Sequence, residues 1–221
     1  MQDIGIQQAS KNSIANPLPM SWLGLADAPT VPPDWAAIPV LSPNEFKNLK
    51  AQIAYDYSQW DYSKLDQDNN LGRYQFSPVQ LENYGVLAAD SNYYYGLDCI
   101  NYQACWQQNP IRRNTNAISN YLHNITSQSE FLSSKIAQEQ LADQLIYDYY
   151  NALVQNGAIV STDSADTVAG MIYVAWQLGV GSTPGVSNAQ GTGAYSWRYF
   201  GNGNGTNSFN SGRYSITVLT Q

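Results

Sequence analysis

The chain has 221 residues, of which only 12% are charged, and a formal net charge of −7. Its length suits one large domain with a hydrophobic core of its own, with or without an appended arm. Proteins that bind nucleic acids or anionic membrane surfaces need clusters of lysine and arginine, and the sequence offers only the pair Arg112-Arg113. The sequence therefore argues against nucleic acids and anionic membrane surfaces as partners. No apolar run reaches the length of a membrane span.

The cysteines and the histidine bear on compartment and on metal binding. Cys99 and Cys105 lie close together in LDCINYQACW. Two thiols this close in a tyrosine-rich, lysine-poor chain favour a disulfide and an oxidising compartment; the alternative is two unrelated reduced thiols. The single histidine, His123, and the lack of a second pair of ligands argue against a metal site, and no motif indicates a cofactor.

The N-terminal region predicts an extended arm. The first 43 residues hold seven of the ten prolines, and Trp22 and Trp35 are candidate anchoring rings. We place the arm at residues 1–41; it either lies on its own domain or reaches a neighbouring subunit. Residues 1–20 lack the basic start and apolar middle of a signal peptide. If the protein is exported, we therefore expect this numbering to start near the N-terminus of the mature protein.

The first predicted helix begins at Ser42-Pro43, because serine is a favoured cap and proline a favoured first helical residue. Its apolar positions recur at a spacing of three and four residues: Phe46, Leu49, Ile53 and Tyr57. We expect the helix to end within residues 58–61 and a loop to occupy residues 62–70.

The chain is organised around residues 71–85, LGRYQFSPVQLENYG. A glycine turn leads into an extended stretch, and Ser77-Pro78 then opens a second helix that runs to about Ala89. Its apolar side carries Val79, Leu81 and Leu87. A helix start needs neither the glycine turn nor the Tyr74-Gln75 pair before it. We therefore interpret this pair as polar side chains presented to a ligand.

Further along, a tyrosine-rich loop at residues 92–109 precedes three more predicted helices, at residues 116–124, 129–156 and 164–178. The longest has a capping box formed by Ser127 and Glu130 and stops at Asn156-Gly157. Glycine, serine and asparagine dominate after residue 179, and the alternation in RYSITVL predicts a single strand at residues 213–219. The chain is thus predicted to be a mainly α domain with a Gly/Asn-rich C-terminal region.

Four blocks of sequence follow one another in a set order. They are Tyr57-Ser58-Gln59-Trp60-Asp61-Tyr62, Gly72-Arg73-Tyr74-Gln75-Phe76, residues 131–145 with Gln138-Glu139, and residues 169–181 followed by Asn204-Gly205-Thr206 and Tyr214. In this order they resemble the Glu-Ser-x-x-x-Tyr, Gly-Lys-Tyr-Gln-Phe, long-helix and Ala-Ala-His-Leu-Gly-Gly blocks of lysozyme-like muramidases and lytic transglycosylases of the phage- and secretion-associated type. The resemblance implies an α+β lysozyme-like domain at residues 42–221.

Two positions depart from the family pattern. The glutamate that serves as general acid falls on Tyr57, and the histidine of the fourth block falls on Trp176. A phenol, with an ordinary pKa near 10, is a poor proton donor for a glycosidic oxygen at neutral pH. A shift of the alignment by one residue would put Asp56 in the acid position, whereas we interpret Asp66 and Asp68 as solvated loop residues.

The resemblance implies a lysozyme-like domain that has lost its acid. Such a domain would bind peptidoglycan glycan strands or act as a structural subunit of a periplasmic envelope assembly, for example a secretion apparatus, with the arm contacting other envelope proteins. Tyr57, Tyr74 and Trp176 would stack on sugars, and Gln75 would bond an acetamido group. The alternative is an active glycosidase that uses Asp56 or a loop aspartate.

Overall fold

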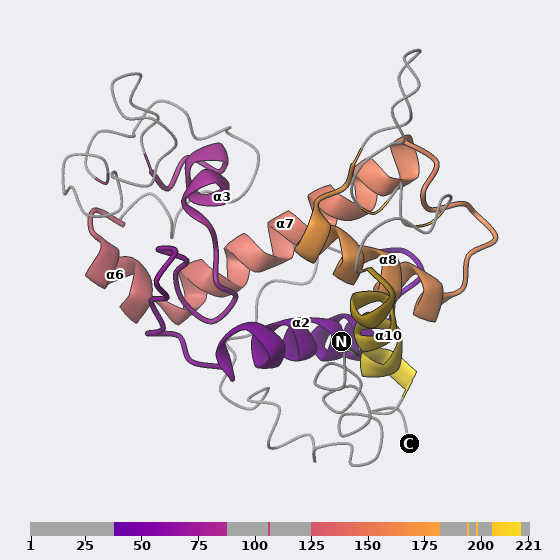
Figure 1. Ribbon diagram of the computed structural model, residues 1–221, viewed down its shortest axis with the longest axis horizontal. Helices are drawn as coiled ribbons and strands as arrows, with labels where there is room; N and C mark the ends of the chain where they lie inside the picture. The colour runs from indigo at the N-terminus through magenta and orange to yellow at the C-terminus, as the bar shows by residue number, and fades with distance from the viewer. Residues whose placement is uncertain are drawn as a thin grey trace, which may run out of the picture. The chain divides into compact units, whose positions relative to one another are not determined.

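The computed structural model describes residues 38–87, 106, 125–181, 194, 198 and 205–217, and these are mainly helical (Figure 1). The helices of this part are α2 (Pro43–Ser58), α3 (Pro78–Asn83), α6 (Gln128–Ser133), α7 (Lys135–Gln155), α8 (Ala165–Leu178) and α10 (Gly205–Thr217). In the same residues, β-structure consists of two isolated bridges, from Leu71 to Leu65 and to Phe76. The mainly helical fold class is therefore confirmed.

The chain divides into two compact units, and each is described by itself. In the part of the chain that the structure describes, one unit takes in residues 38–53 and those from 145 onward, and the other takes in those between 54 and 144. The division falls within α2 and α7, so each of these helices contributes to both units. None of the helices described is long and apolar enough to cross a membrane.

Several predicted features lie outside the described residues: the arm up to residue 37, all of the loop at 92–109 except Trp106, and the helix at 116–124. The predicted boundary at residue 41 stays a prediction.

α2 begins and ends through local signals. At its start the Ser42 N–H donates to Glu45 Oε2 at 2.6 Å and the Glu45 N–H donates to Ser42 Oγ at 3.3 Å, a reciprocal capping box. At its end Gln59 and Trp60 adopt φ values of 56° and 66°, and the Trp60 N–H bonds back to Ala54 O at 3.2 Å. Left-handed residues after the last turn are the usual way to stop a helix. The predicted limits of α2 are confirmed.

α3 is shorter than predicted. Ser77 and Gln80 form a capping box at its start, with bonds of 2.8 and 3.2 Å. Gly85, at φ 70°, then reverses the chain within two residues of the last helical position. The helix therefore ends at Asn83 rather than near Ala89, and Val79, which was placed on its apolar side, is exposed.

The single helix predicted at residues 129–156 is two helices, α6 and α7, because Ser134 leaves the helical conformation with ψ 89°. Ser134 Oγ then accepts the Ala137 N–H at 3.3 Å in the first turn of α7. The Ser127 hydroxyl accepts the Glu130 N–H as predicted, at 3.2 Å, but the Glu130 carboxylate bonds Thr126 instead of completing the capping box.

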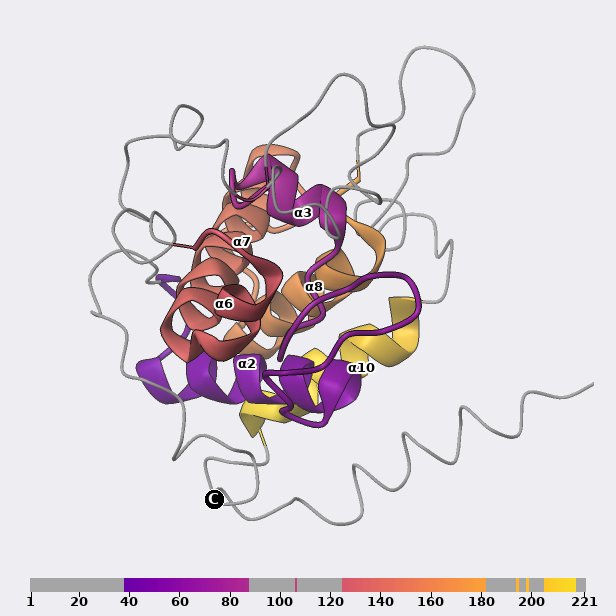
Figure 2. The same cartoon turned by 90° about the vertical axis from the view of Figure 1, so that its left-hand side faces the viewer.

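The predicted strand at residues 213–219 is wrong over its described part, because residues 213–217 belong to α10. α10 packs beside α8 in both views (Figures 1 and 2), and it buries Gly212, Ser215 and Ile216 at a helical spacing of three and four. The short alternation of RYSITVL could not reveal this packing. α8 itself confirms the helix predicted at 164–178.

The contact between α8 and α10 depends on glycine. A Cβ atom at Gly212 would lie 2.5 Å from Ala169 O and 2.6 Å from Tyr173 Cβ, and a Cβ atom at Gly170 would lie 2.6 Å from the Phe209 ring. Each glycine therefore leaves the space that an atom of the facing helix occupies.

We expect Gly212→Ala to lower the free energy of unfolding by about 1–3 kcal/mol, as in an overpacked core. This outweighs the intrinsic gain of about 0.5–1 kcal/mol that alanine brings to a helix interior. Urea denaturation measures the difference. Ser211→Ala, at the neighbouring half-buried position, is the control and should change stability little. A Gly212→Ala variant as stable as the wild type would contradict the close helix contact.

Candidate functional site

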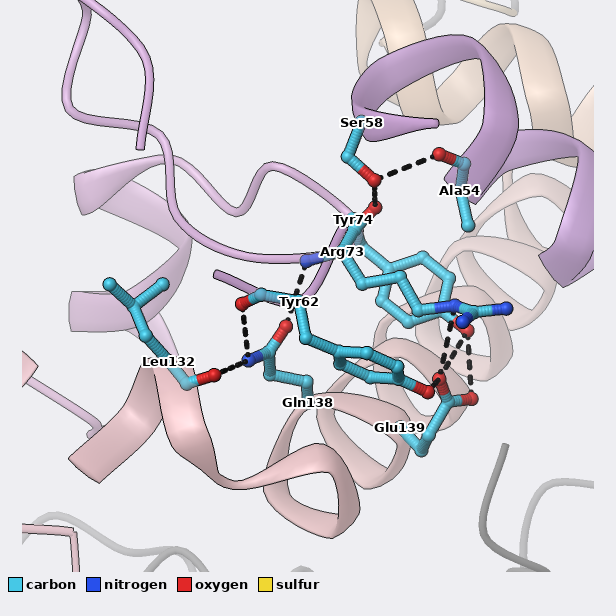
Figure 3. A network of polar contacts seen from close by, with 8 residues as sticks. All are labelled: Ala54, Ser58, Tyr62, Arg73, Tyr74, Leu132, Gln138 and Glu139. Atoms are coloured by element: carbon cyan, nitrogen blue, oxygen red, sulfur yellow. Dashed lines mark hydrogen bonds and ion pairs between the residues drawn. The ribbon is translucent and has the colours of Figure 1, made fainter. Parts of the chain in front are cut away.

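A buried carboxylate forms the centre of the unit that contains residues 54–144. Glu139 lies in a stretch of α7, residues 137–143, that is buried over its whole circumference, and its residue exposure is 1%. The hydroxyl of Tyr62 donates to Glu139 Oε1 at 2.7 Å, and the hydroxyl of Tyr74 donates to both oxygens at 2.9 and 2.7 Å. Figure 3 shows both rings directed at this carboxylate.

Arg73 supplies the positive charge that a buried carboxylate requires. Its Nε lies 3.4 Å from Glu139 Oε1, and both side chains are 2% exposed. The guanidinium carbon also lies 4.8 Å from the ring centroid of Tyr62 and 5.9 Å from that of Tyr74. The same two phenols therefore donate to the anion and offer ring faces to the cation.

The surroundings of Glu139 change the acidity of both tyrosines. Burial, followed by the negative charge of Glu139, raises the pKa of Tyr74 well above its ordinary value, although Arg73 opposes the shift. The pKa of Tyr62 is raised by the same causes in the same order. Both phenols therefore keep their protons, and remain hydrogen-bond donors, to a higher pH than an ordinary tyrosine.

Gln138, next to Glu139 on α7, binds the backbone of the same region. Its Oε1 accepts the Arg73 N–H at 2.8 Å, and its Nε2 donates to Tyr62 O at 3.1 Å. Nε2 also contacts two carbonyls of α6, Phe131 O at 3.0 Å and Leu132 O at 3.2 Å, the latter drawn in Figure 3. Gly72 has φ +75°, and a Cβ there would overlap the Gln138 amide, so both conformation and space require glycine.

Ser58 joins the end of α2 to the same region. Its hydroxyl lies 2.5 Å from Arg73 O and 3.0 Å from Ala54 O, so its one proton is shared between two carbonyl acceptors (Figure 3). The first three sequence blocks thus meet in one polar network. We call the set Ser58, Tyr62, Arg73, Tyr74, Gln138 and Glu139 the Glu139 cluster.

Of the predicted ligand-binding residues, Tyr74 belongs to this cluster, and Tyr57 and Gln75 adjoin it in the sequence. Tyr57 is half-buried at the end of α2, and its carbonyl accepts Lys64 Nζ at 2.5 Å. Gln75 is 8% exposed and donates through Nε2 to Gly72 O at 2.8 Å and Lys64 O at 3.4 Å. Tyr74 is 1% exposed, so its ring belongs to the core rather than to a surface for stacking.

Trp176, the fourth predicted ligand-binding residue, belongs to the unit that contains α8 and α10. It is 7% exposed on α8, and the Tyr149 ring meets it edge-on with 6.1 Å between centroids. Cys99, Cys105 and His123 lie outside the described residues. Ligand binding by Tyr57, Tyr74, Gln75 and Trp176 stays a prediction.

The described acids near the end of α2 lie at the surface or bond within their own loop. Asp56 is exposed, and Asp61 Oδ1 accepts from the Ser63 N–H and hydroxyl at 2.8 and 2.7 Å. Partial burial raises the pKa of Asp66, but hydrogen bonds from Asn70 and the Asp68 backbone, together with Lys64, outweigh it and lower the pKa overall. No group of three or more His, Cys, Asp or Glu within the described ranges could hold a metal ion.

Sequence reasoning gave no role to Glu139 or Arg73, which the structure places at the centre of the site. Glu139 lies in a stretch of α7 that is rich in polar residues, with Gln138, Gln140 and Asp143 around it, and its hydrogen bond to Tyr62 spans 77 positions. No local signal in the sequence therefore marks this carboxylate for burial.

No family model, curated protein or solved structure matches the chain. Its function must therefore be inferred from the residues themselves.

The raised pKa of Tyr74 predicts alkaline destabilisation. Below pH ~10 both states hold the proton and the contribution to stability is complete; above pH ~10 the unfolded chain releases it while the folded chain retains it. The free energy of unfolding should then fall by up to about 1.4 kcal/mol per pH unit from this residue. Urea titrations at a series of pH values measure the slope.

Tyr74→Phe should make that fall shallower. Leu81→Ala, a buried position in α3 that carries no titratable group, is the control and should lower stability without changing the slope. Equal slopes in wild type and Tyr74→Phe would contradict a phenol kept neutral by burial and by Glu139.

Proposed function

We propose that this chain is a lysozyme-like domain without glycosidase activity, which acts as a peptidoglycan-binding or structural subunit of an exported, periplasmic assembly such as a secretion apparatus. The supporting observation is the end of α2. Tyr57 stands where the resembled enzymes have their glutamate, and the nearby buried carboxylate, Glu139, is held by two phenols and a guanidinium.

Cleavage of a glycosidic bond needs a carboxylic acid that protonates the leaving oxygen. Loss of that acid removes about 10²–10⁴-fold of the rate. Glu139, at 1% exposure with both oxygens bonded, is in no position to replace it. It serves instead as an anchor for the residues around it.

The Glu139 cluster supports the kinship that the motif order suggests. Ser58 comes from the first block, Arg73 from the second and Glu139 from the third, and direct contacts join them.

For a glycan ligand, the geometry favours Gln75 and Tyr57 over the other predicted residues. Gln75 Oε1 is a buried acceptor without a hydrogen-bond partner in the described part of the chain. Tyr57 is only half-buried, and Lys64 connects the two, since its Nζ bonds the Tyr57 carbonyl and its carbonyl accepts from Gln75. An acetamido N–H is a donor suited to this acceptor.

The rival proposal is an active glycosidase that uses Asp56 or a loop aspartate. Asp56 is one residue from Tyr57, but it is exposed, whereas glycosidase acids gain their raised pKa from burial. Asp66 is ionised more readily than an ordinary aspartate. These surroundings favour the inactive domain.

Incubation of the protein with purified peptidoglycan tests the proposal. We expect no release of soluble muropeptides, while the protein sediments with the insoluble material. Gln75→Met should weaken sedimentation about tenfold in Kd, equivalent to ~1.4 kcal/mol for one lost bond to a buried acceptor. Gln67→Met, at an exposed loop position, is the matched control and should bind like the wild type.

Muropeptide release that Asp56→Asn abolishes would overturn the inactive reading in favour of the rival. Absence of both release and sedimentation would leave the structural role and remove the glycan-binding one.

A further inference from the structure

We infer that Glu139 and Gln138 are positioning residues: they hold residues 72–74 and so fix the orientation of the Gln75 amide, the group proposed to bond a ligand. The inference rests on the proposed function for the identity of the ligand, a glycan with acetamido groups. The fixed orientation of the Gln75 amide depends on the protein alone, so it can be tested without any ligand.

The backbone of Gln75 is in an unfavourable conformation. Its φ of 51° is left-handed, which costs free energy for a residue with a side chain. A bond from its own N–H to Gly72 O at 3.1 Å closes the turn. Residues held in such conformations persist only where their surroundings enforce them, and they concentrate at functional sites.

The orientation of the Gln75 amide follows from its neighbours. Nε2 lies 2.8 Å from Gly72 O and 3.4 Å from Lys64 O, and carbonyl oxygens only accept hydrogen bonds. The nitrogen must therefore face these two groups, and Oε1 must point away from them. That oxygen is buried and lacks a partner among the described residues.

Contacts with α7 fix the residues on the N-terminal side of Gln75. Gln138 accepts the Arg73 N–H at 2.8 Å and packs where Gly72 has no side chain. Glu139 accepts the Tyr74 hydroxyl at 2.7 Å and pairs with Arg73 at 3.4 Å. Two adjacent residues of one helix thus hold the three residues before Gln75, and the turn cannot relax while these contacts remain.

The first experiment measures exchange of the Gln75 side-chain amide protons by NMR of the full chain. In the wild type, the bonds to Gly72 and Lys64 should slow their exchange with water. Tyr74→Phe, which removes one hydroxyl and keeps the ion pair, should speed exchange about tenfold, and Glu139→Gln should speed it further. Leu81→Ala destabilises the same unit without touching the cluster, and it should leave this exchange within about twofold of the wild type after correction for global unfolding. Equal effects of Leu81→Ala and Tyr74→Phe would overturn the inference.

The second experiment measures binding of tri-N-acetylchitotriose by titration calorimetry. If Tyr74 acts through Gln75, Tyr74→Phe should raise Kd about tenfold in the wild-type background and leave it unchanged in a Gln75→Met background. An equal rise in both backgrounds contradicts positioning and indicates a general loss of structure. If the wild type binds neither this probe nor peptidoglycan while the exchange result holds, the glycan-binding proposal fails and the positioning role stands.

Discussion

A carboxylate buried in a protein must be surrounded by donors and cations, and this requirement determines the arrangement around Glu139. Its partners come from separate stretches of the chain: Tyr62 from the loop after α2, and Arg73 with Tyr74 from the turn before α3. Gln138 adds backbone bonds to the same stretches. Because each partner satisfies the carboxylate only in one geometry, the irregular segment between α2 and α3 is held in place without a sheet.

This use of a glutamate for structure bears on function. In a glycosidase a carboxyl group at the reacting bond must gain and lose a proton, so it must be reachable. In this chain the described carboxylates near the end of α2 are exposed without the burial that raises an acid's pKa, bonded within their own loop, or enclosed like Glu139. The resemblance puts Tyr57 at the acid position, and under the proposed function the groups around Gln75 would bind a ligand rather than cleave it.

Features decided by neighbours in the sequence could be predicted. Ser42-Pro43 and Ser77-Pro78 are starts of helices because the capping bonds reach only three residues. Features decided across the chain could not. Residues 213–217 are helical because Gly212 fits against Ala169 and Tyr173 of α8. Tyr74 is buried because its hydroxyl bonds Glu139, which lies 65 positions further along the chain. The motif with Tyr74 and Gln75 lies at the Glu139 cluster, whereas the inward direction of Tyr74 depends on Glu139, a residue to which the sequence assigned no role.

The central claim is that Arg73 and Glu139 stabilise each other inside the protein, and a double-mutant cycle with Arg73→Met and Glu139→Leu tests it most directly. Each single variant leaves one buried charge without its partner, whereas the double variant removes both. We predict that urea unfolding will show the double variant to be more stable than the sum of the single losses implies, with a coupling of about 1–3 kcal/mol. Strictly additive losses would contradict the claim that this ion pair organises the site.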